Sequence, residues 1–164
     1  MTAPSHDVRA TRREGTGRPD THVAHSAAVS LLRAADLVRR QTAAIVEPRG
    51  ITVQQFNVLR ILRGAVAGEG TGLPTLEVGA RMIEQTPGVT RLLDRLEAKS
   101  LVRRERCRED RRQHLCRITP KGLEVLAGLD EPVVAGSREA LRGLTAAQQA
   151  ELLNLLDALR EAHE

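Results

Sequence analysis

The stretch Thr75–Gly122 constrains the fold of this chain more than any other part of the sequence. A short helical segment is predicted from Thr75, which we expect to cap it, with Leu76, Ala80 and Ile83 facing inward. A second helix is predicted only a few residues later, from Thr86. Its apolar residues recur at helical spacing and mark a buried face: Val89, Leu92, Leu93 and Leu96. Two helices this close together predict a helix-turn-helix.

A basic hairpin is predicted directly after the second helix. Short β-prone runs, Leu101-Val102 and Leu115–Ile118, stand on either side of the polar segment RRERCREDRRQH. Between Thr86 and Gly122 there are 11 cationic against 5 anionic side chains, a net charge of +6. From Leu123 to the end there are 3 against 8, a net charge of −5. The first of these regions is therefore suited to a polyanion and the second is not.

Composition favours helices for the rest of the chain. The sequence has 164 residues, of which 41% are apolar, and its single aromatic residue is Phe56. A core of Leu, Val, Ile and Ala with almost no aromatic residues is typical of helical proteins rather than of β-sandwiches. We therefore predict a mainly α protein with a small two-stranded β wing, a winged helix-turn-helix with dimerisation helices at both ends.

Helix start and stop signals predict two helices before Thr75. An amphipathic helix is predicted over Thr21–Val46, ended by Pro48 and Gly50. Thr52 and Gln55 form a predicted capping box at the next helix, which we expect to end in the Gly-rich loop of residues 64–74.

Further helices are predicted near the C-terminus. Thr119-Pro120 begins one, which Pro132 should kink or break, and Thr145 with Gln148 caps the last.

These signals predict four regions. They are a mobile tail (1–20), an N-terminal dimerisation helix (21–50), a winged helix-turn-helix (51–119) and C-terminal dimerisation helices (120–164). The apolar stripes at the two ends exceed what a small winged domain could cover. We expect a two-fold homodimer to bury them through Leu31, Leu152, Leu155, Leu156 and Leu159. Such a dimer would set two DNA-reading helices about 34 Å apart, as palindromic operators require.

Three segments together resemble the MarR family of bacterial transcription regulators. They are ITVQQFNVL at Ile51–Leu59, TPGVTRLLDRLEAKSLVRR at Thr86–Arg104 and DRRQHLCRITPKG at Asp110–Gly122. The resemblance implies a dimeric winged helix-turn-helix protein that binds double-stranded DNA, usually represses promoters, and in many cases releases DNA when a small aromatic or phenolic effector binds. It also implies a recognition helix at Thr86–Lys99 and a wing at Arg104–Arg117, in which Asp110 orients the wing and a wing arginine enters the minor groove.

The chain departs from the family pattern at two places. Cys107-Arg108 stands where the family commonly has Asp-Pro after the first wing strand. Ser100 stands where the family commonly has Gly before that strand, and we expect Ser to fit the turn.

The candidate DNA contacts fall in two groups. In the recognition helix, Thr90, Arg91 and Arg95 are predicted to read the major groove, while Thr86, Pro87, Gly88 and the nearby amides reach phosphate. In the wing, the predicted minor-groove contacts are Arg108, Arg111 and Arg112. The alternatives are that Arg95 pairs with acidic neighbours such as Asp94 or Glu97, and that Arg112 pairs with Asp110.

The sequence gives less support to other functions. The chain has no nucleophile elbow, phosphate loop or HExxH motif, so we predict no enzyme activity, no cofactor and no metal site. The HxxH pair His22 and His25 lacks an evident third ligand. No apolar run is long enough to cross a membrane, and a cytoplasmic location is expected. Two alternatives remain: a winged helix that docks onto protein, and a redox-sensing regulator acting through Cys107.

Overall fold

The computed structural model describes residues 21–69, 72–84, 88–106 and 114–163. The chain divides into two compact units, Met1–Ala34 and Ala35–Glu164. In the first unit the described residues are the beginning of a long helix with exposed apolar side chains, among them Val23 and Leu32. All other elements belong to the second unit, which contains the helix-turn-helix and the sheet.

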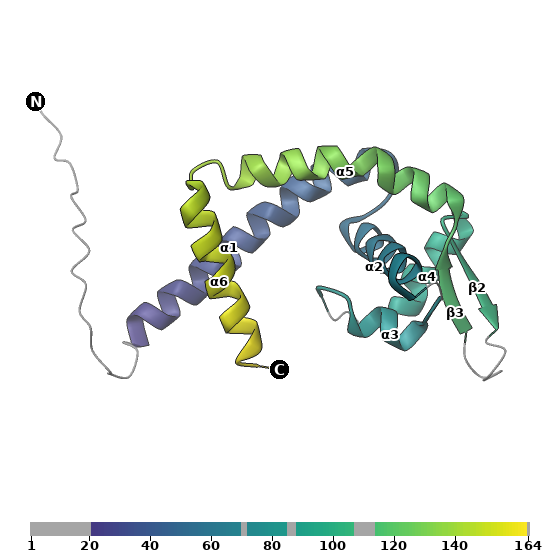
Figure 1. Ribbon diagram of the computed structural model, residues 1–164, viewed down its shortest axis with the longest axis horizontal. Helices are drawn as coiled ribbons and strands as arrows, with labels where there is room; N and C mark the ends of the chain where they lie inside the picture. Colours follow the sequence, from purple (N-terminus) through teal and green to yellow (C-terminus); the bar gives the residue numbers. More distant parts are fainter. Residues whose placement is uncertain (1–20, 70–71, 85–87, 107–113, 164) are drawn as a thin grey trace, which may run out of the picture. The chain divides into compact units, whose positions relative to one another are not determined.

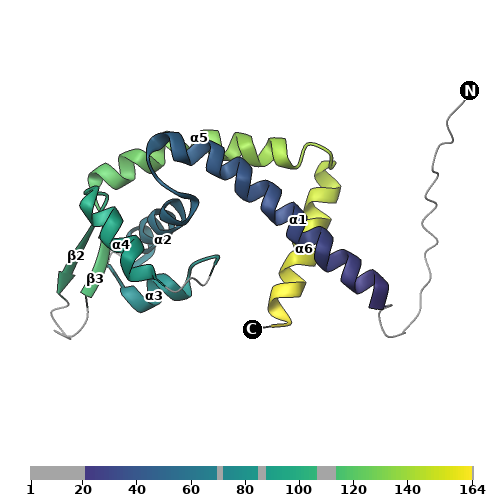
Figure 2. The same ribbon diagram turned by 180° about the vertical axis from the view of Figure 1, so that it is seen from behind.

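Helices predominate along the chain (Figure 1). In order, the elements are α1 (Thr21–Val46), η1 (Glu47–Arg49), α2 (Val53–Glu69), β1 (Leu73–Pro74), α3 (Thr75–Ala80), α4 (Val89–Ala98), β2 (Val102–Arg106), β3 (His114–Ile118), α5 (Pro120–Ala140) and α6 (Ala146–Glu161). In the second unit α2 contacts α3, α4, α5 and β3, so it is the central helix (Figure 2). Among the described residues, no helix is long and apolar enough to cross a membrane.

Local signals in the sequence set several helix ends. The long helix over Thr21–Val46 is confirmed. The Thr52–Gln55 capping box is confirmed by reciprocal side-chain to backbone hydrogen bonds, both of 3.2 Å. Thr119 Oγ1 accepts a hydrogen bond from the Gly122 amide at 3.1 Å and caps α5, while Thr145 and Gln148 form a second capping box at α6.

Two predicted helix breaks are wrong. Gly64 and Gly68 do not lie in a loop, because α2 continues through both of them to Glu69. Pro132 lies inside α5, which continues to Ala140, so the predicted break does not occur, while the alternative of a kink stays a prediction. A proline in a helix interior costs about 3 kcal/mol. Burial of the same face of α5 on both sides of it, by Leu129 and Val133, offsets that cost.

The predicted inward face of the first helix of the helix-turn-helix is also wrong. Leu76 is 89% exposed, Ile83 is 82% exposed, and Ala80 is exposed as well. The buried residues of this segment are instead Val78 and Met82, four residues apart. Periodicity alone could not choose between the two stripes, because both are apolar and the helix has only six residues.

The predicted pairing of the two wing strands is confirmed, and β1 adds a third strand that was not predicted, so the sheet has the order β1-β3-β2. Strand β2 pairs antiparallel with β3, Arg104 lying opposite Cys116. Strand β1 adds Leu73 opposite the same Cys116 on the other side. It has only two residues, the second of them proline, which is compatible with an edge strand. The sequence pattern for so short a strand is too weak to predict it.

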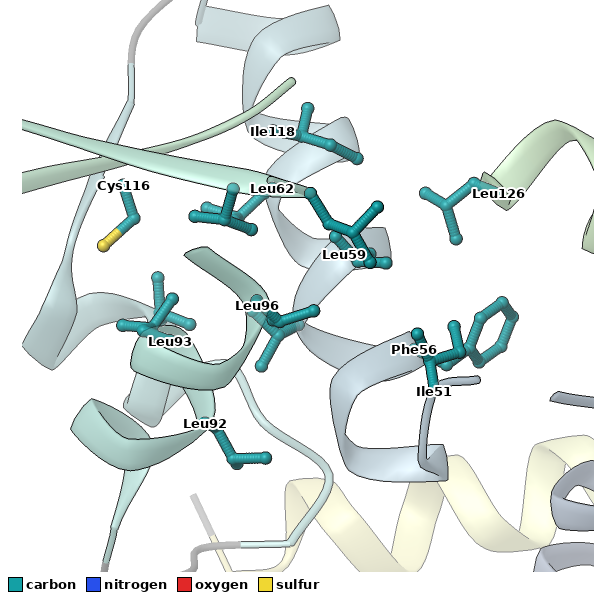
Figure 3. Packing of buried hydrophobic residues seen from close by; sticks show 14 of the residues in the cluster. Ile51, Phe56, Leu59, Leu62, Leu92, Leu93, Leu96, Cys116, Ile118 and Leu126 are labelled. Atoms are coloured by element: carbon teal, nitrogen blue, oxygen red, sulfur yellow. The ribbon is translucent and has the colours of Figure 1, made fainter. Parts of the chain in front are cut away.

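The core lies where α2, α4 and the sheet meet. Figure 3 shows Leu93 and Leu96 of α4 directed towards Leu59 and Leu62 of α2, with Cys116 close by on β3. These side chains are at most 1% exposed. At about 25 cal/mol per Å², their burial is the main term that fixes α4 on the domain. The opposite side of α4 is consequently held towards solvent.

Candidate nucleic-acid interface

Helix α4 begins later than predicted. It starts at Val89, and its N-cap is Gly88 with φ +122°, not Thr86. Because L-residues rarely adopt such a φ angle, the right-handed helix cannot extend back through Gly88. The predicted sites Thr86 and Pro87 lie outside the described residues. Thr75 is likewise the first residue of α3 rather than its cap, and its hydroxyl lies 3.7 Å from Cys116 Sγ.

The exposed face of α4 presents the predicted major-groove residues. Leu92, Leu93 and Leu96 are buried, while Thr90, Arg91 and Arg95 are exposed on the same helix. Gly88 is exposed at its start. Within the described part of the chain, Arg91 and Arg95 form no ion pair with a carboxylate. Both guanidinium groups lie on the solvent-exposed side of α4.

The acidic residues of α4 are bound by Arg104 of β2. Its backbone N–H and its Nε donate to the Glu97 carboxylate at 3.0 and 2.9 Å. One terminal nitrogen donates to Glu97 at 2.6 Å and to Asp94 at 2.5 Å. These hydrogen bonds hold the pKa of Glu97 below its usual range and raise the pKa of Arg104. The alternative that Arg95 pairs with Asp94 or Glu97 is therefore wrong.

The C-terminal end of α4 is bound to two other segments. Lys99 Nζ donates to the Gly50 carbonyl oxygen at 2.6 Å and to Gln55 Oε1 at 3.1 Å. Lys121 Nζ donates to the Lys99 carbonyl oxygen at 3.0 Å, and Thr119 Oγ1 donates to the Ser100 carbonyl oxygen at 2.8 Å. The C-terminal end of α4 is thus fixed to the starts of both α2 and α5. Sequence patterns did not reveal these contacts, because they join residues distant in the chain.

The wing is described only in part. Arg103 and Arg106 are exposed on β2, and His114 is exposed on β3. The predicted wing sites lie between the strands and outside the described residues: Cys107, Arg108, Asp110, Arg111 and Arg112. Their roles stay predictions. Strand β2 ends at Arg106, directly before that segment, and β3 begins at His114, directly after it.

Cys116 lies in the core. Its side chain is fully buried, and burial raises the pKa of its thiol, which the Thr75 hydroxyl and Arg104 only partly counteract. A buried thiol with a raised pKa is a poor nucleophile. In the sheet, Cys116 lies opposite Arg104. Among the described residues, no three His, Cys, Asp or Glu side chains gather in a group that could hold a metal ion.

Comparison with known proteins decides the family. A model of the MarR family matches residues 79–114, which span α4 and the first wing strand. A MarR transcription factor of known structure from Planctomyces limnophilus is 33% identical, with a TM-score of 0.64 over 86% of this chain and 99% of that one. The chain belongs to the MarR family of transcriptional regulators.

Two further similar proteins extend the comparison. The HTH-type transcriptional regulator TtmR of Methylorubrum extorquens is 31% identical over 148 residues, which cover 89% of this chain and 72% of TtmR. A mutant MarR from E. coli, solved in complex with operator DNA, is 25% identical with a TM-score of 0.72, over 85% of this chain and 98% of that one. The mainly helical winged fold of this chain is that of the MarR family.

Proposed function

We propose that this MarR-family protein binds double-stranded DNA in a sequence-specific manner, as a homodimer on a pseudo-palindromic operator. The observation that supports DNA binding most directly is the exposed face of α4. Arg91 and Arg95 are solvent-accessible and unpaired with acids in the described residues, whereas Asp94 and Glu97 are both bound by Arg104. A helix with this charge arrangement presents cationic donors to a polyanion at low electrostatic cost.

The residues divide between base reading and phosphate binding. Arg91 and Arg95 can donate to guanine in the major groove, and Thr90 can contact bases or a thymine methyl. The segment Thr86-Pro87-Gly88 precedes α4 and is proposed to bring its first free amides to phosphate. In the wing, Arg108, Arg111 and Arg112 are proposed to enter the minor groove, with Asp110 orienting them. A mutant MarR from E. coli was solved in complex with operator DNA, which supports double-stranded DNA as the partner.

The homodimer is proposed from the apolar surface of α6. This helix has no buried residue, and Leu153, Leu155 and Leu159 are 58%, 63% and 47% exposed. Single exposed leucines are ordinary, but Leu155 and Leu159 share one face of α6 with the half-buried Leu152 and Leu156, and such a face indicates a surface that a partner covers. A second copy would do so with Leu31, Leu152 and Leu156 included. Regions 21–50 and 120–164 are accordingly proposed for dimerisation, region 51–119 for DNA binding, and region 1–20 as a tail.

Repression relieved by a small effector is the regulatory mode that the family resemblance implies, and we propose it for this chain. Its test is a screen for compounds that release the bound duplex. The effector should lower affinity for specific DNA without unfolding the protein, which thermal unfolding in its presence checks.

DNA binding is tested by selecting duplexes from a random library with the purified protein and measuring the dissociation constant at several salt concentrations. We expect affinity to fall steeply with salt, with a logarithmic slope of about −0.9 per phosphate contacted. The variant Arg91→Met should weaken binding of the selected duplex by roughly 5- to 150-fold.

The matched control is Arg138→Met, which removes the same charge from the exposed surface of α5. It should leave affinity nearly unchanged. Weak, salt-independent duplex binding would contradict the proposal and would favour a protein-docking module.

The dimer is tested separately by sedimentation. Wild-type protein should sediment as a dimer at micromolar concentration, and Leu155→Glu should shift it to monomer. The control Leu76→Glu alters a leucine that is 89% exposed on α3 and should leave the dimer intact. A wild-type monomer at these concentrations would refute the assembly.

A further inference from the structure

Arg104 joins the two elements that the proposed function assigns to DNA. It lies on β2, the strand that leads into the wing, and its hydrogen bonds end on two carboxylates of α4. The direct chain connection between α4 and β2 is the turn Lys99–Leu101. A turn alone leaves the angle between a helix and a strand adjustable, so the contacts of Arg104 supply a second, independent connection.

The geometry of this connection is unusually complete for a surface ion pair. The Arg104 side chain is only 24% exposed, while those of Asp94 and Glu97 are 52% and 39% exposed. Both its backbone N–H and its guanidinium donate to Glu97, so strand and side chain are fixed to the same carboxylate. Multiple charge-assisted hydrogen bonds to one planar group give directional restraint as well as energy. A lysine, which is a single point donor, could not reproduce the arrangement.

The same contacts also change the charge that α4 presents. Asp94 and Glu97 are three residues apart on one side of the helix, where their negative charges repel each other and would repel DNA phosphate. Bound to Arg104, the two carboxylates form a compact group whose net charge falls from −2 to −1, beside Arg91 and Arg95. Neither carboxylate then competes with phosphate for those arginines.

We propose that Arg104 is a positioning residue for DNA recognition: by binding Asp94 and Glu97, it sets the orientation of the wing strand relative to α4. Recognition helix and wing then meet DNA as one rigid body. Arg104 itself makes no base or phosphate contact in this scheme. The inference rests on the proposed function, since it concerns how α4 and the wing are held in a fixed relative orientation for DNA binding.

The test uses the full-length protein, a duplex selected by the wild type and a scrambled duplex of the same length. Dissociation constants for both are measured over a range of salt. The variant is Arg104→Met, and the matched control is Arg103→Met. Arg103 is the neighbouring residue on the same strand, its side chain is 61% exposed, and it pairs with Glu105 of that strand at 3.1 Å. Both variants lose one positive charge, but only the first loses the connection to α4.

The expected results separate positioning from charge. Arg103→Met should weaken binding of the selected and scrambled duplexes by the same factor. The slope of log affinity against log salt should fall in magnitude by at most about one. Arg104→Met should reduce the ratio of specific to non-specific affinity at least tenfold while leaving the salt slope nearly unchanged. If both variants lower both affinities equally, Arg104 acts only through its charge and the proposal is overturned.

A second variant guards against loss of folding. Glu97→Gln keeps the volume and an acceptor oxygen but removes the charge that binds Arg104, and it should lower the specificity ratio in the same direction. The double variant with Arg104→Met should lose no more than Arg104→Met alone, because both changes break one connection. Additive losses would overturn the proposal. Absence of duplex binding by the wild type would instead refute the proposed function itself.

Discussion

The guanidinium of Arg63 on α2 donates two hydrogen bonds to the carboxylate of Asp130 on α5, at 2.7 and 2.9 Å. The two residues are 67 positions apart in the sequence. This pair lies between the central helix of the DNA-binding region and the helix proposed for dimerisation.

The Arg63–Asp130 pair should make a small, pH-dependent contribution to stability. The hydrogen bonds from Arg63 hold the pKa of Asp130 below its usual range. The stabilisation is then present above the pKa of an unfolded aspartate and is lost as the pH falls through the lowered folded value. Because the side chains are 35% and 49% exposed, solvent screening limits it to about 1 kcal/mol or less. Urea unfolding of Asp130→Asn at neutral pH and below pH 4 should show the difference from wild type shrinking in acid. A difference that grows in acid would contradict it.

Replacing Ser100 with glycine should stabilise the folded protein. It has φ +60°, and it ends α4 with hydrogen bonds from its own amide to Glu97 and from the Leu101 amide to Leu96, at 2.8 and 2.9 Å. This pattern is a Schellman motif, whose left-handed position favours glycine. We expect Ser100→Gly to raise the free energy of unfolding by about 0.5–1 kcal/mol, measured by urea denaturation. Ser100→Ala, which keeps the Cβ, should give no such gain, and a destabilised glycine variant would show this reasoning to be wrong.

Truncation of two leucines in the helix-turn-helix should affect stability to very different extents. Leu93 on α4 is fully buried, so Leu93→Ala should cost about 2–5 kcal/mol through lost burial and the cavity left behind. Leu76 on α3 is 89% exposed, and Leu76→Ala should change stability by less than about 0.5 kcal/mol. Thermal unfolding followed by circular dichroism measures both. Equal losses would mean that Leu76 is covered in the folded protein.

Cys116 should be inert towards thiol reagents in the native state. The variant Cys107→Ser leaves Cys116 as the only thiol in the sequence. Because Cys116 is fully buried and burial raises the pKa of its thiol, little thiolate is available at neutral pH. Reaction with Ellman's reagent should be fast in denaturant and at least tenfold slower without it. Rapid native reaction would reopen a redox role for this residue.

The sequence predicted several helix caps and the buried face of α4 correctly, because these features depend on residues close together in the chain. The hydroxyl of Thr119 and the reciprocal bonds of Thr52 with Gln55 depend on residues three apart, so spacing alone identified them. The buried stripe of α4 was equally readable, because ten residues give enough turns for periodicity to be decisive. In α3, with six residues, the same reasoning chose the wrong side.

The candidate interface was only partly predictable. The sequence alone determined the family resemblance, the positions of most helices and the exposed arginines of α4, since propensity, capping and amphipathic spacing are local. Tertiary structure decided that α2 continues through its glycines, that α5 continues through Pro132, and that β1 joins the wing. It also decided that Arg104, and not Arg95, binds the acids of α4. These outcomes depend on burial and on charge pairs formed between separate elements, and such energies exist only once the chain has folded.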